Sequence, residues 1–262
     1  MSRFGWLEMD DGGSAGRDSG GAPEQQDIDE SHCLARADAH LREGRYESAL
    51  QWYSRALRYN TELEEAWAGQ VRCLLELHEE VEANVWADRG LARFPDCPDL
   101  LAAKAVALKR RRGVARAMEY SDASLGVKGK TVGPYPWIVR GDIVLNGGGS
   151  RESAARCFSK ALEIGGHDWY THYLIGVALM RSRSHDQARR RLSAAAGMEG
   201  ATALAHCALG QCYEKLGEVG GAILAYNRAL EADRGWKQAK SRLAALENVG
   251  WFGRLVRRLR GG

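Results

Sequence analysis

The sequence contains few residues of the kinds that break helices or cross-link a small fold. Five prolines occur in 262 residues, and the six cysteines form no CxxC pair and no Cys/His grouping with the spacing of a zinc site. We therefore expect buried, reduced cysteines and neither a metal nor a cofactor. No apolar run of about 18 residues occurs, and residues 1–10 lack the apolar stretch of a signal peptide. These absences predict a cytoplasmic protein without a membrane-spanning helix.

A large excess of one charge is also missing. The formal net charge of +3 is too small to indicate a nucleic-acid-binding face, so we expect no nucleic-acid partner. Acidic residues gather in the first thirty positions and arginines in the last ten. The two ends of the chain therefore carry opposite charge.

A motif of the form Ala-x3-aromatic-x2-Ala recurs along the chain in three strong and three weaker copies. Successive copies are 34, 34, 37, 34 and 34 residues apart. The leading residues are Ala49, Ala83, Ala117, Ala154, Ala188 and Ala222. A second series of small or slim residues precedes the first by about twelve positions, at Ala37, Val71, Ala105, Gly141, Gly176 and Gly210. Two series at a fixed offset predict two closely packed helices in each period.

This pattern resembles the tetratricopeptide repeat (TPR), whose consensus is Trp-x2-Leu-Gly-x2-Tyr, then Ala-x3-Phe-x2-Ala, then Pro. The last copy matches best, with Leu209, Gly210, Tyr213, Gly217, Ala222, Tyr226 and Ala229. Trp67 and Trp137 occupy the opening aromatic position of two copies, and Pro95 closes the second. The resemblance implies an all-α, right-handed α-solenoid of about six helix-turn-helix repeats plus a C-terminal capping helix.

The same register divides the chain into four kinds of segment. Residues 1–29 are expected to be a flexible N-terminal segment, 237–248 the capping helix and 249–262 a basic amphipathic tail. The repeats are expected over 30–236, at about 30–63, 64–97, 98–133, 134–168, 169–202 and 203–236.

The third copy departs most from the pattern. Ser121 and Ser124 replace the aromatic residue and the alanine. Loops rich in glycine are predicted within 126–136 and 146–150, because glycine and proline disfavour helix interiors. We therefore predict looser packing in this repeat and a weak joint between the two halves.

No convergent set of catalytic residues is evident, so the chain is predicted not to be an enzyme. Asp168 and Asp186, each after a histidine and before a helix, are interpreted as N-caps. Gly147–Gly149 lacks the following Lys-Ser/Thr of a phosphate-binding loop.

The resemblance implies that a partner contacts the concave face, at fixed positions in the first helix of each repeat. Carried over by register, these positions predict a partner-binding groove. Its residues are Leu34, Asp38, Arg72, Val106, Lys109, Arg110, Tyr135, Ile138, Asp142, Tyr170, Tyr173, Val177, Met180 and Gln211. Each of them could instead belong to ordinary packing between helices. Leu34 and Asp38 replace the lysine and asparagine with which chaperone-tail adaptors grip a carboxylate, so that clamp is absent.

We therefore predict a protein-interaction scaffold or adaptor that binds a peptide or protein segment in the concave TPR groove. Tyr135, Tyr170, Tyr173 and Met180 are expected to form one aromatic-apolar surface bordered by Lys109 and Arg110. Such a surface suits a partner with apolar anchors next to acidic residues.

Both ends of the chain carry amphipathic segments. Near the N-terminus, Phe4, Trp6, Leu7 and Met9 stand among acidic residues. They could dock in the groove in cis, dock on another protein, or have no role. The C-terminal tail combines Trp251, Phe252, Arg254, Leu255, Arg257 and Arg258. It could lie on an anionic membrane, pair with an acidic partner or extend the capping helix. A peripheral membrane tether is the alternative function.

Overall fold

The computed structural model describes residues 29–111 and 113–246. These residues form helices and connecting loops and contain no strand, which confirms the predicted all-α fold. The helices pair as α1 (Glu30–Arg42) and α2 (Tyr46–Tyr59), α3 (Glu64–Glu76) and α4 (Glu80–Arg93), α5 (Pro98–Arg110) and α6 (Val114–Leu125), α7 (Pro134–Asn146) and α8 (Arg151–Gly165), α9 (Trp169–Arg181) and α10 (His185–Gly197), and α11 (Ala203–Leu216) and α12 (Val219–Ala232). A further helix occupies residues 237–246 and reaches the end of the described range.

Small residues in the first helix of a repeat let the second helix approach closely. A Cβ atom added to Gly141 would lie 2.4 Å from Cε1 of Phe158, and one added to Gly210 would lie 2.5 Å from Cε1 of Tyr226. Real Cβ atoms are not found that close to a ring, so the aromatic ring fills the space that the glycine leaves. The glycines of the second sequence series therefore set the spacing of the helix pairs.

The starts of the helices follow from local sequence. The side chains of Asp29, Ser150 and Asp168 accept hydrogen bonds from the first turns of α1, α8 and α9, which confirms the interpretation of Asp168 as an N-cap. Asp186 instead lies within the first turn of α10, after the N-cap residue Ser184. The predicted loop over 126–136 ends earlier than expected. Pro134 opens α7, where a missing N–H costs nothing, so residues 134–136 are helical.

The third repeat does not show the predicted looser packing between its two helices. Ser121 and Ser124 are fully buried, and α5 contacts α6 as extensively as α1 contacts α2. Serine is small enough for the helices to close over it. Among consecutive helices, α8 and α9 instead share the fewest contacts.

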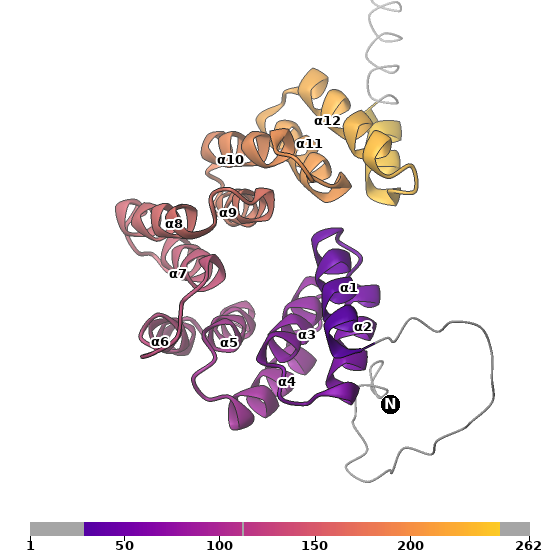
Figure 1. Ribbon diagram of the computed structural model, residues 1–262. Helices are drawn as coiled ribbons and strands as arrows, with labels where there is room; N and C mark the ends of the chain where they lie inside the picture. The colour runs from indigo at the N-terminus through magenta and orange to yellow at the C-terminus, as the bar shows by residue number, and fades with distance from the viewer. Residues whose placement is uncertain (1–28, 112, 247–262) are drawn as a thin grey trace, which may run out of the picture.

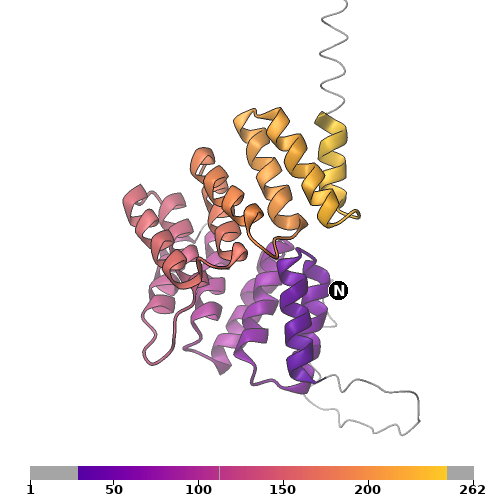
Figure 2. The same cartoon turned by 45° about the horizontal axis from the view of Figure 1, so that its top comes forward.

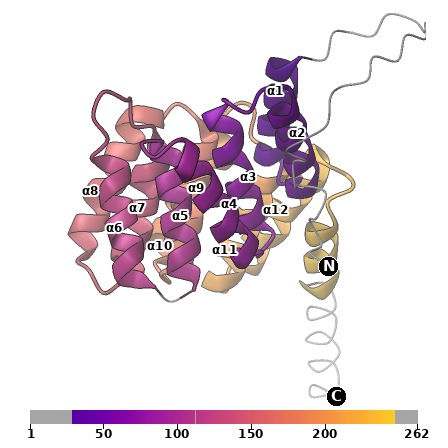
Figure 3. The same cartoon turned by 90° about the horizontal axis from the view of Figure 1, so that it is seen from below.

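The helices wind into a solenoid with the odd-numbered helices on the inside and the even-numbered helices on the outside (Figure 1). Figure 2 and Figure 3 show that the last repeat lies next to the first. Arg45 Nη2 is 3.2 Å from Asp233 Oδ2, and Thr202 Oγ1 donates a 3.1 Å hydrogen bond to the carbonyl of Arg42. The six repeats thus complete a turn and touch across it.

Gly44, in the turn between α1 and α2, makes this contact possible. Its φ of +74° favours glycine, and a Cβ atom there would lie 2.9 Å from Cη2 of Trp236. The turn of the first repeat therefore packs directly against the segment that precedes the helix at residues 237–246.

Candidate functional site

Aromatic residues from different repeats meet on the inside of the solenoid. The guanidinium carbon of Arg72, on α3, lies 4.3 Å from the ring centre of Tyr135 and 5.8 Å from that of Tyr170. Tyr170 stacks on Tyr173 with ring centres 5.6 Å apart. Trp169 packs edge-on against Tyr170 at 5.4 Å. We call Arg72, Tyr135, Trp169, Tyr170 and Tyr173 the inner aromatic cluster.

The first repeat closes over this cluster. Arg42, the last residue of α1, lies 5.4 Å from the ring centre of Trp169 and 5.2 Å from that of Tyr170. Its guanidinium donates to both carboxylate oxygens of Asp168, and one of these hydrogen bonds measures 3.0 Å. Asp168 also accepts a hydrogen bond from the backbone N–H of Tyr170 as the N-cap of α9. One carboxylate therefore caps a helix and anchors the first repeat.

The inner tyrosines are consequently not an open surface, contrary to expectation. Tyr170 and Tyr173 are each 7% exposed, and Tyr135 is partly buried. The sequence placed these residues correctly on the inner face. The difference arises because α1 returns across the same face after one turn of the solenoid.

A cleft of about 260 Å³ remains beside the cluster. Its charged walls are Asp38, Arg42, Arg72, Asp99 and Asp168, and its less polar walls are Leu41, Pro134, Tyr135, Tyr170, Thr171 and Leu174. Arg72 forms no ion pair with a carboxylate anywhere in the described residues. Three aspartates against two arginines give these walls a formal charge of −1.

Burial controls the ionisation of the groups around this cleft. It raises the pKa of Tyr170 to about 12, although the Arg72 charge acts in the opposite direction. It also raises the pKa of Tyr135 and of Tyr173. The pKa of Asp99 is raised by burial too, with Arg72 again opposing the shift. The phenols are therefore neutral hydrogen-bonding groups at physiological pH.

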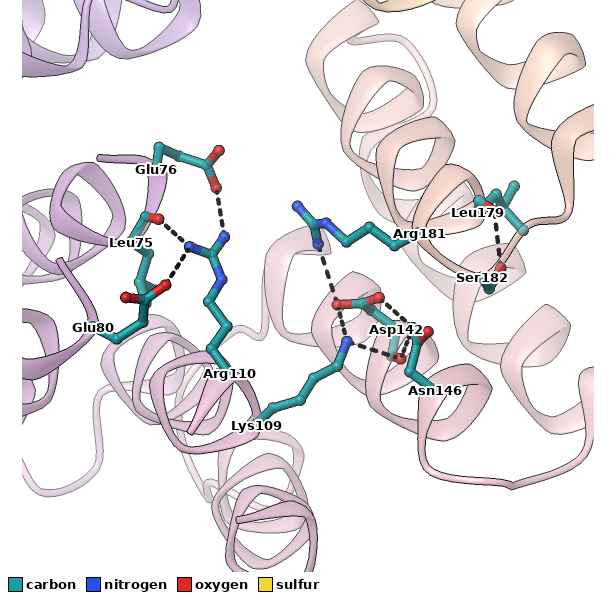
Figure 4. A network of polar contacts seen from close by, with 10 residues as sticks. All are labelled: Leu75, Glu76, Glu80, Lys109, Arg110, Asp142, Asn146, Leu179, Arg181 and Ser182. Atoms are coloured by element: carbon teal, nitrogen blue, oxygen red, sulfur yellow. Dashed lines mark hydrogen bonds and ion pairs between the residues drawn. The ribbon is translucent and has the colours of Figure 1, made fainter. Parts of the chain in front are cut away.

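Lys109 and Asp142, which were predicted to line the groove, instead form ion pairs within the chain (Figure 4). Lys109 Nζ is 2.6 Å from Asp142 Oδ2, and Arg181 Nη1 is 3.3 Å from the same oxygen. The other oxygen of Asp142 accepts a 2.9 Å hydrogen bond from Asn146 Nδ2. Burial lowers the pKa of Lys109, while Asp142 opposes that shift. These contacts join the third, fourth and fifth repeats.

Arg110 reaches back to the second repeat (Figure 4). It donates a hydrogen bond to the carbonyl of Leu75 and lies 3.5 Å from Glu76 and 3.7 Å from Glu80. Arg110 and Lys109 therefore tie neighbouring repeats together and do not form the unpaired basic border that was expected.

The remaining predicted groove residues are dispersed. Val106 and Ile138 are buried in the core, which is a correction to their assignment as partner contacts. Leu34, Val177 and Met180 are partly buried and pack against the core. Asp38 accepts a hydrogen bond from the hydroxyl of Tyr53, and Gln211 is partly buried. The tail residues Trp251, Phe252, Arg254, Leu255, Arg257 and Arg258 lie outside the described residues, as do Phe4, Trp6, Leu7 and Met9.

Several residues of the site were not predicted as such. Asp99 and Trp169 fall outside the register of the implied contacts, and Asp168 was expected only as a cap. The pairing of Asp168 with Arg42 spans 126 positions, so no local pattern indicates it. In the part of the chain that the structure describes, no group of three or more His, Cys, Asp or Glu side chains could hold a metal, and none of the helices there could cross a bilayer.

Comparison with known proteins settles the family. Tetratricopeptide-repeat models match residues 40–107 and residues 173–236, which together make up just over half of the chain. The chain belongs to the TPR family. TPR proteins are in general non-enzymatic scaffolds for protein interactions, and their stacked repeats present an extended inner surface.

Solved TPR structures share the fold at low sequence identity. A tetratricopeptide repeat protein from Parabacteroides merdae is 16% identical with a TM-score of 0.54, over 85% of this chain and 86% of that one. A thermophilic TPR protein from Thermus thermophilus is 21% identical with a TM-score of 0.50, over 83% and 98% of the two chains. No curated protein has a matching sequence.

Proposed function

We propose that this TPR protein is a scaffold without catalytic turnover that binds a segment of another protein in the inner cleft. Arg72 is the central contact in this proposal. The cleft is the part of the predicted concave groove that remains open beside the inner aromatic cluster.

The state of Arg72 is the observation that carries the proposal. The guanidinium is held against the face of Tyr135, so its orientation is fixed, yet it forms no ion pair with any carboxylate of the described residues. A guanidinium has five N–H donors, and a stacked one keeps most of them at its edges. Such donors suit a carboxylate or a backbone carbonyl of a bound peptide.

The walls of the cleft define the kind of segment that fits. Tyr135, Tyr170 and Leu174 offer apolar contact at low entropic cost. Asp38 and Asp99 disfavour a ligand with several acidic residues, because like charges would meet in a partly buried site. We therefore expect a segment with one apolar anchor and at most one carboxylate. The sequence had suggested a partner with several acidic residues next to its apolar anchors, so the expected partner is less acidic.

Peptides selected on the full chain from a phage-displayed library test the proposal. We expect Arg72→Gln to weaken their binding, measured by calorimetry, by about tenfold or more, since a charge-assisted hydrogen bond is lost. Arg89 is a matched control because its guanidinium also lies over a ring, 5.0 Å from the centre of Trp86 on the outer helix α4. Peptides that bind Arg72→Gln and Arg89→Gln as tightly as the parent chain would refute the proposal.

The peripheral membrane tether remains the alternative proposal, and it depends on residues 249–262. Co-sedimentation of the full chain with anionic vesicles at physiological salt tests it. Binding that is lost on truncation before Gly250 would favour the tether, and absence of binding would eliminate it. A cytoplasmic location likewise stays a prediction.

A further inference from the structure

The two ends of the solenoid differ in how they are covered. At the last repeat, the helix at residues 237–246 buries Ala239 and Leu243 against α11 and α12. A terminal repeat needs such a cover, because no neighbouring repeat packs on its end. At the first repeat, α1 packs against α2 and α3 on one side (Figure 1). Its other side is an exposed strip with helical spacing, formed by His32, Ala35, Arg36 and Ala39.

Trp52 of α2 lies beside this strip and carries two arginines. The guanidinium carbons of Arg36 and Arg55 lie 5.8 Å and 5.4 Å from the centre of the Trp52 ring. The ring of His32 meets the indole edge-on at 6.1 Å. A depression of about 470 Å³ has Trp52, Arg55 and Arg58 in its walls. We call these five residues the end patch.

The arginines of the end patch are not neutralised by the part of the chain that the structure describes. Arg36, Arg55 and Arg58 form no ion pair with a carboxylate there. Arg45, in the turn between the same two helices, is by contrast paired with Asp233 at 3.2 Å. A guanidinium stacked on an indole keeps its N–H edges for carboxylates and its outer face for a second ring. The end patch is therefore complementary to a segment that presents an aromatic side chain next to acidic ones.

We propose that residues 4–11 of this same chain dock on the end patch. The segment reads Phe-Gly-Trp-Leu-Glu-Met-Asp-Asp. Trp6 stacks on the guanidinium of Arg36, which is an exposed residue, and extends the stack of ring and cation. The three carboxylates of the segment meet the edges of the three arginines, so the charges of +3 and −3 cancel at the contact.

The charges of the inner cleft disfavour the same segment there. Asp38, Asp99 and Asp168 stand in its walls against two arginines, and three further carboxylates would meet them in a partly buried site. The walls of the depression beside Trp52 hold no acidic residue. The segment therefore belongs on the end patch, and the inner cleft stays available for a partner.

The end patch lies within easy reach of the segment. Arg36 belongs to the second turn of α1, so it is only about 10 Å along the helix axis from Asp29. Residues 12–28 can span up to about 56 Å, which is several times that distance. A tether of this length gives an effective concentration in the millimolar range, so docking in cis needs only modest intrinsic affinity.

Photo-cross-linking of the full chain tests where the segment lies. With p-benzoylphenylalanine in place of Trp6, the stacking ring is kept, and we expect intramolecular cross-links to α1 and α2 near Trp52. Arg36→Glu with Arg55→Glu should lower the yield of these cross-links about fivefold or more, since two favourable charge contacts become repulsive.

Reversing the charge of the segment tests the same contact from its other side. Glu8→Lys, Asp10→Lys and Asp11→Lys together should lower the yield by a similar factor, and they change no residue of the described fold. Combining them with the two arginine substitutions should restore most of the yield, because the charges become complementary again. A loss of fold in the arginine variant would not be restored in this way.

Matched controls separate this proposal from a general charge effect and from the proposed function. Arg89→Glu with Arg228→Glu changes the net charge equally at exposed positions, and Arg89 also lies over an indole, so the yield should stay unchanged. Circular dichroism shows whether each variant keeps its helices. Arg72→Gln should not alter the yield, so failure at the inner cleft is distinguishable. Cross-links to the walls of the inner cleft, cross-links between two chains, or a yield unaffected by charge reversal on either side would each overturn the proposal.

Discussion

Arg42 and Asp168 lie 126 residues apart in the sequence and form a two-pronged ion pair between the first and fifth repeats. Their side chains are 38% and 36% exposed, so water screens the interaction. The pair nevertheless holds α1 against Trp169 and Tyr170 and forms one wall of the inner cleft.

A double-mutant cycle with Arg42→Gln and Asp168→Asn measures the strength of this contact. Asparagine keeps an N-cap acceptor for α9 while removing the charge. We expect a coupling free energy of about 0.5–1 kcal/mol in urea unfolding at low salt, and a smaller one at high salt. Additive effects of the two substitutions at low salt would show that the pair contributes nothing.

Gly141→Ala tests the close approach of paired helices. The new methyl group would lie 2.4 Å from a carbon of the Phe158 ring, so the ring or the helix must move. We expect a loss of about 1–3 kcal/mol in the free energy of unfolding. Gly220→Ala is the control, because no atom lies within 4 Å of its added Cβ, and it should be neutral or slightly stabilising.

The buried hydroxyl of Ser121 offers a stabilising change. Its oxygen is buried without a hydrogen-bond partner, whereas Ser124 Oγ donates to the carbonyl of Ser121 at 2.8 Å. Ser121→Ala should raise the free energy of unfolding by about 1 kcal/mol, since an unsatisfied polar group is removed. Ser124→Ala should have a smaller effect. A destabilised Ser121→Ala protein would show that the hydroxyl has a partner in solution, such as a water molecule.

Because burial raises the pKa of the inner tyrosines, we expect the free energy of unfolding to fall in alkaline solution. Tyr170 has a pKa of about 12 in the folded protein against 10 in a model phenol. Between these values the unfolded chain loses its proton first, so stability is complete below pH 10 and falls as pH rises toward 12. We expect Tyr170→Phe to reduce this fall by about 1 kcal/mol at pH 11, measured by urea unfolding at pH 9 and pH 11. If the free energy of unfolding fell equally between pH 9 and pH 11 in the parent chain and in Tyr170→Phe, the raised pKa of Tyr170 would be contradicted.

Hydrogen exchange tests the predicted weak joint. We expect residues 113–150 to be less protected than residues 203–230, because a loop separates α6 from α7 and these two helices share fewer contacts than most consecutive pairs. The sparse contact between α8 and α9 predicts faster exchange there as well. Protection of all these segments at the level of residues 203–230 would argue for one cooperative unit.

Much of the fold could be predicted because it depends on local spacing. The repeat period places Gly141 opposite Phe158 and Gly210 opposite Tyr226, and the structure pairs both. Pro134 was expected in a loop because proline breaks helix interiors, but the first helical position tolerates it. Composition alone does not distinguish a proline in a loop from a proline at the first position of a helix.

The site was predictable only in part, for a geometric reason. Register correctly brought Arg72, Tyr135, Tyr170 and Tyr173 to one face. Whether that face is open depends on the pitch of the whole solenoid, which is a sum of small rotations over six repeats. The pairing of Lys109 with Asp142 likewise depends on the angle between adjacent repeats, and no motif encodes that angle.

The contact of Gly44 with Trp236 makes the number of repeats a determinant of the shape of the inner cleft. In an open solenoid the two ends make no contact with each other, so a repeat can be added or lost without disturbing any contact between them. Here the coil meets itself after one revolution, so one 34-residue unit more or fewer between the first and fifth repeats would carry Asp168 away from Arg42 and remove a wall of the cleft. Evolution by duplication or loss of a repeat, which is easy for a linear array, would in this protein change the proposed binding surface in the same step.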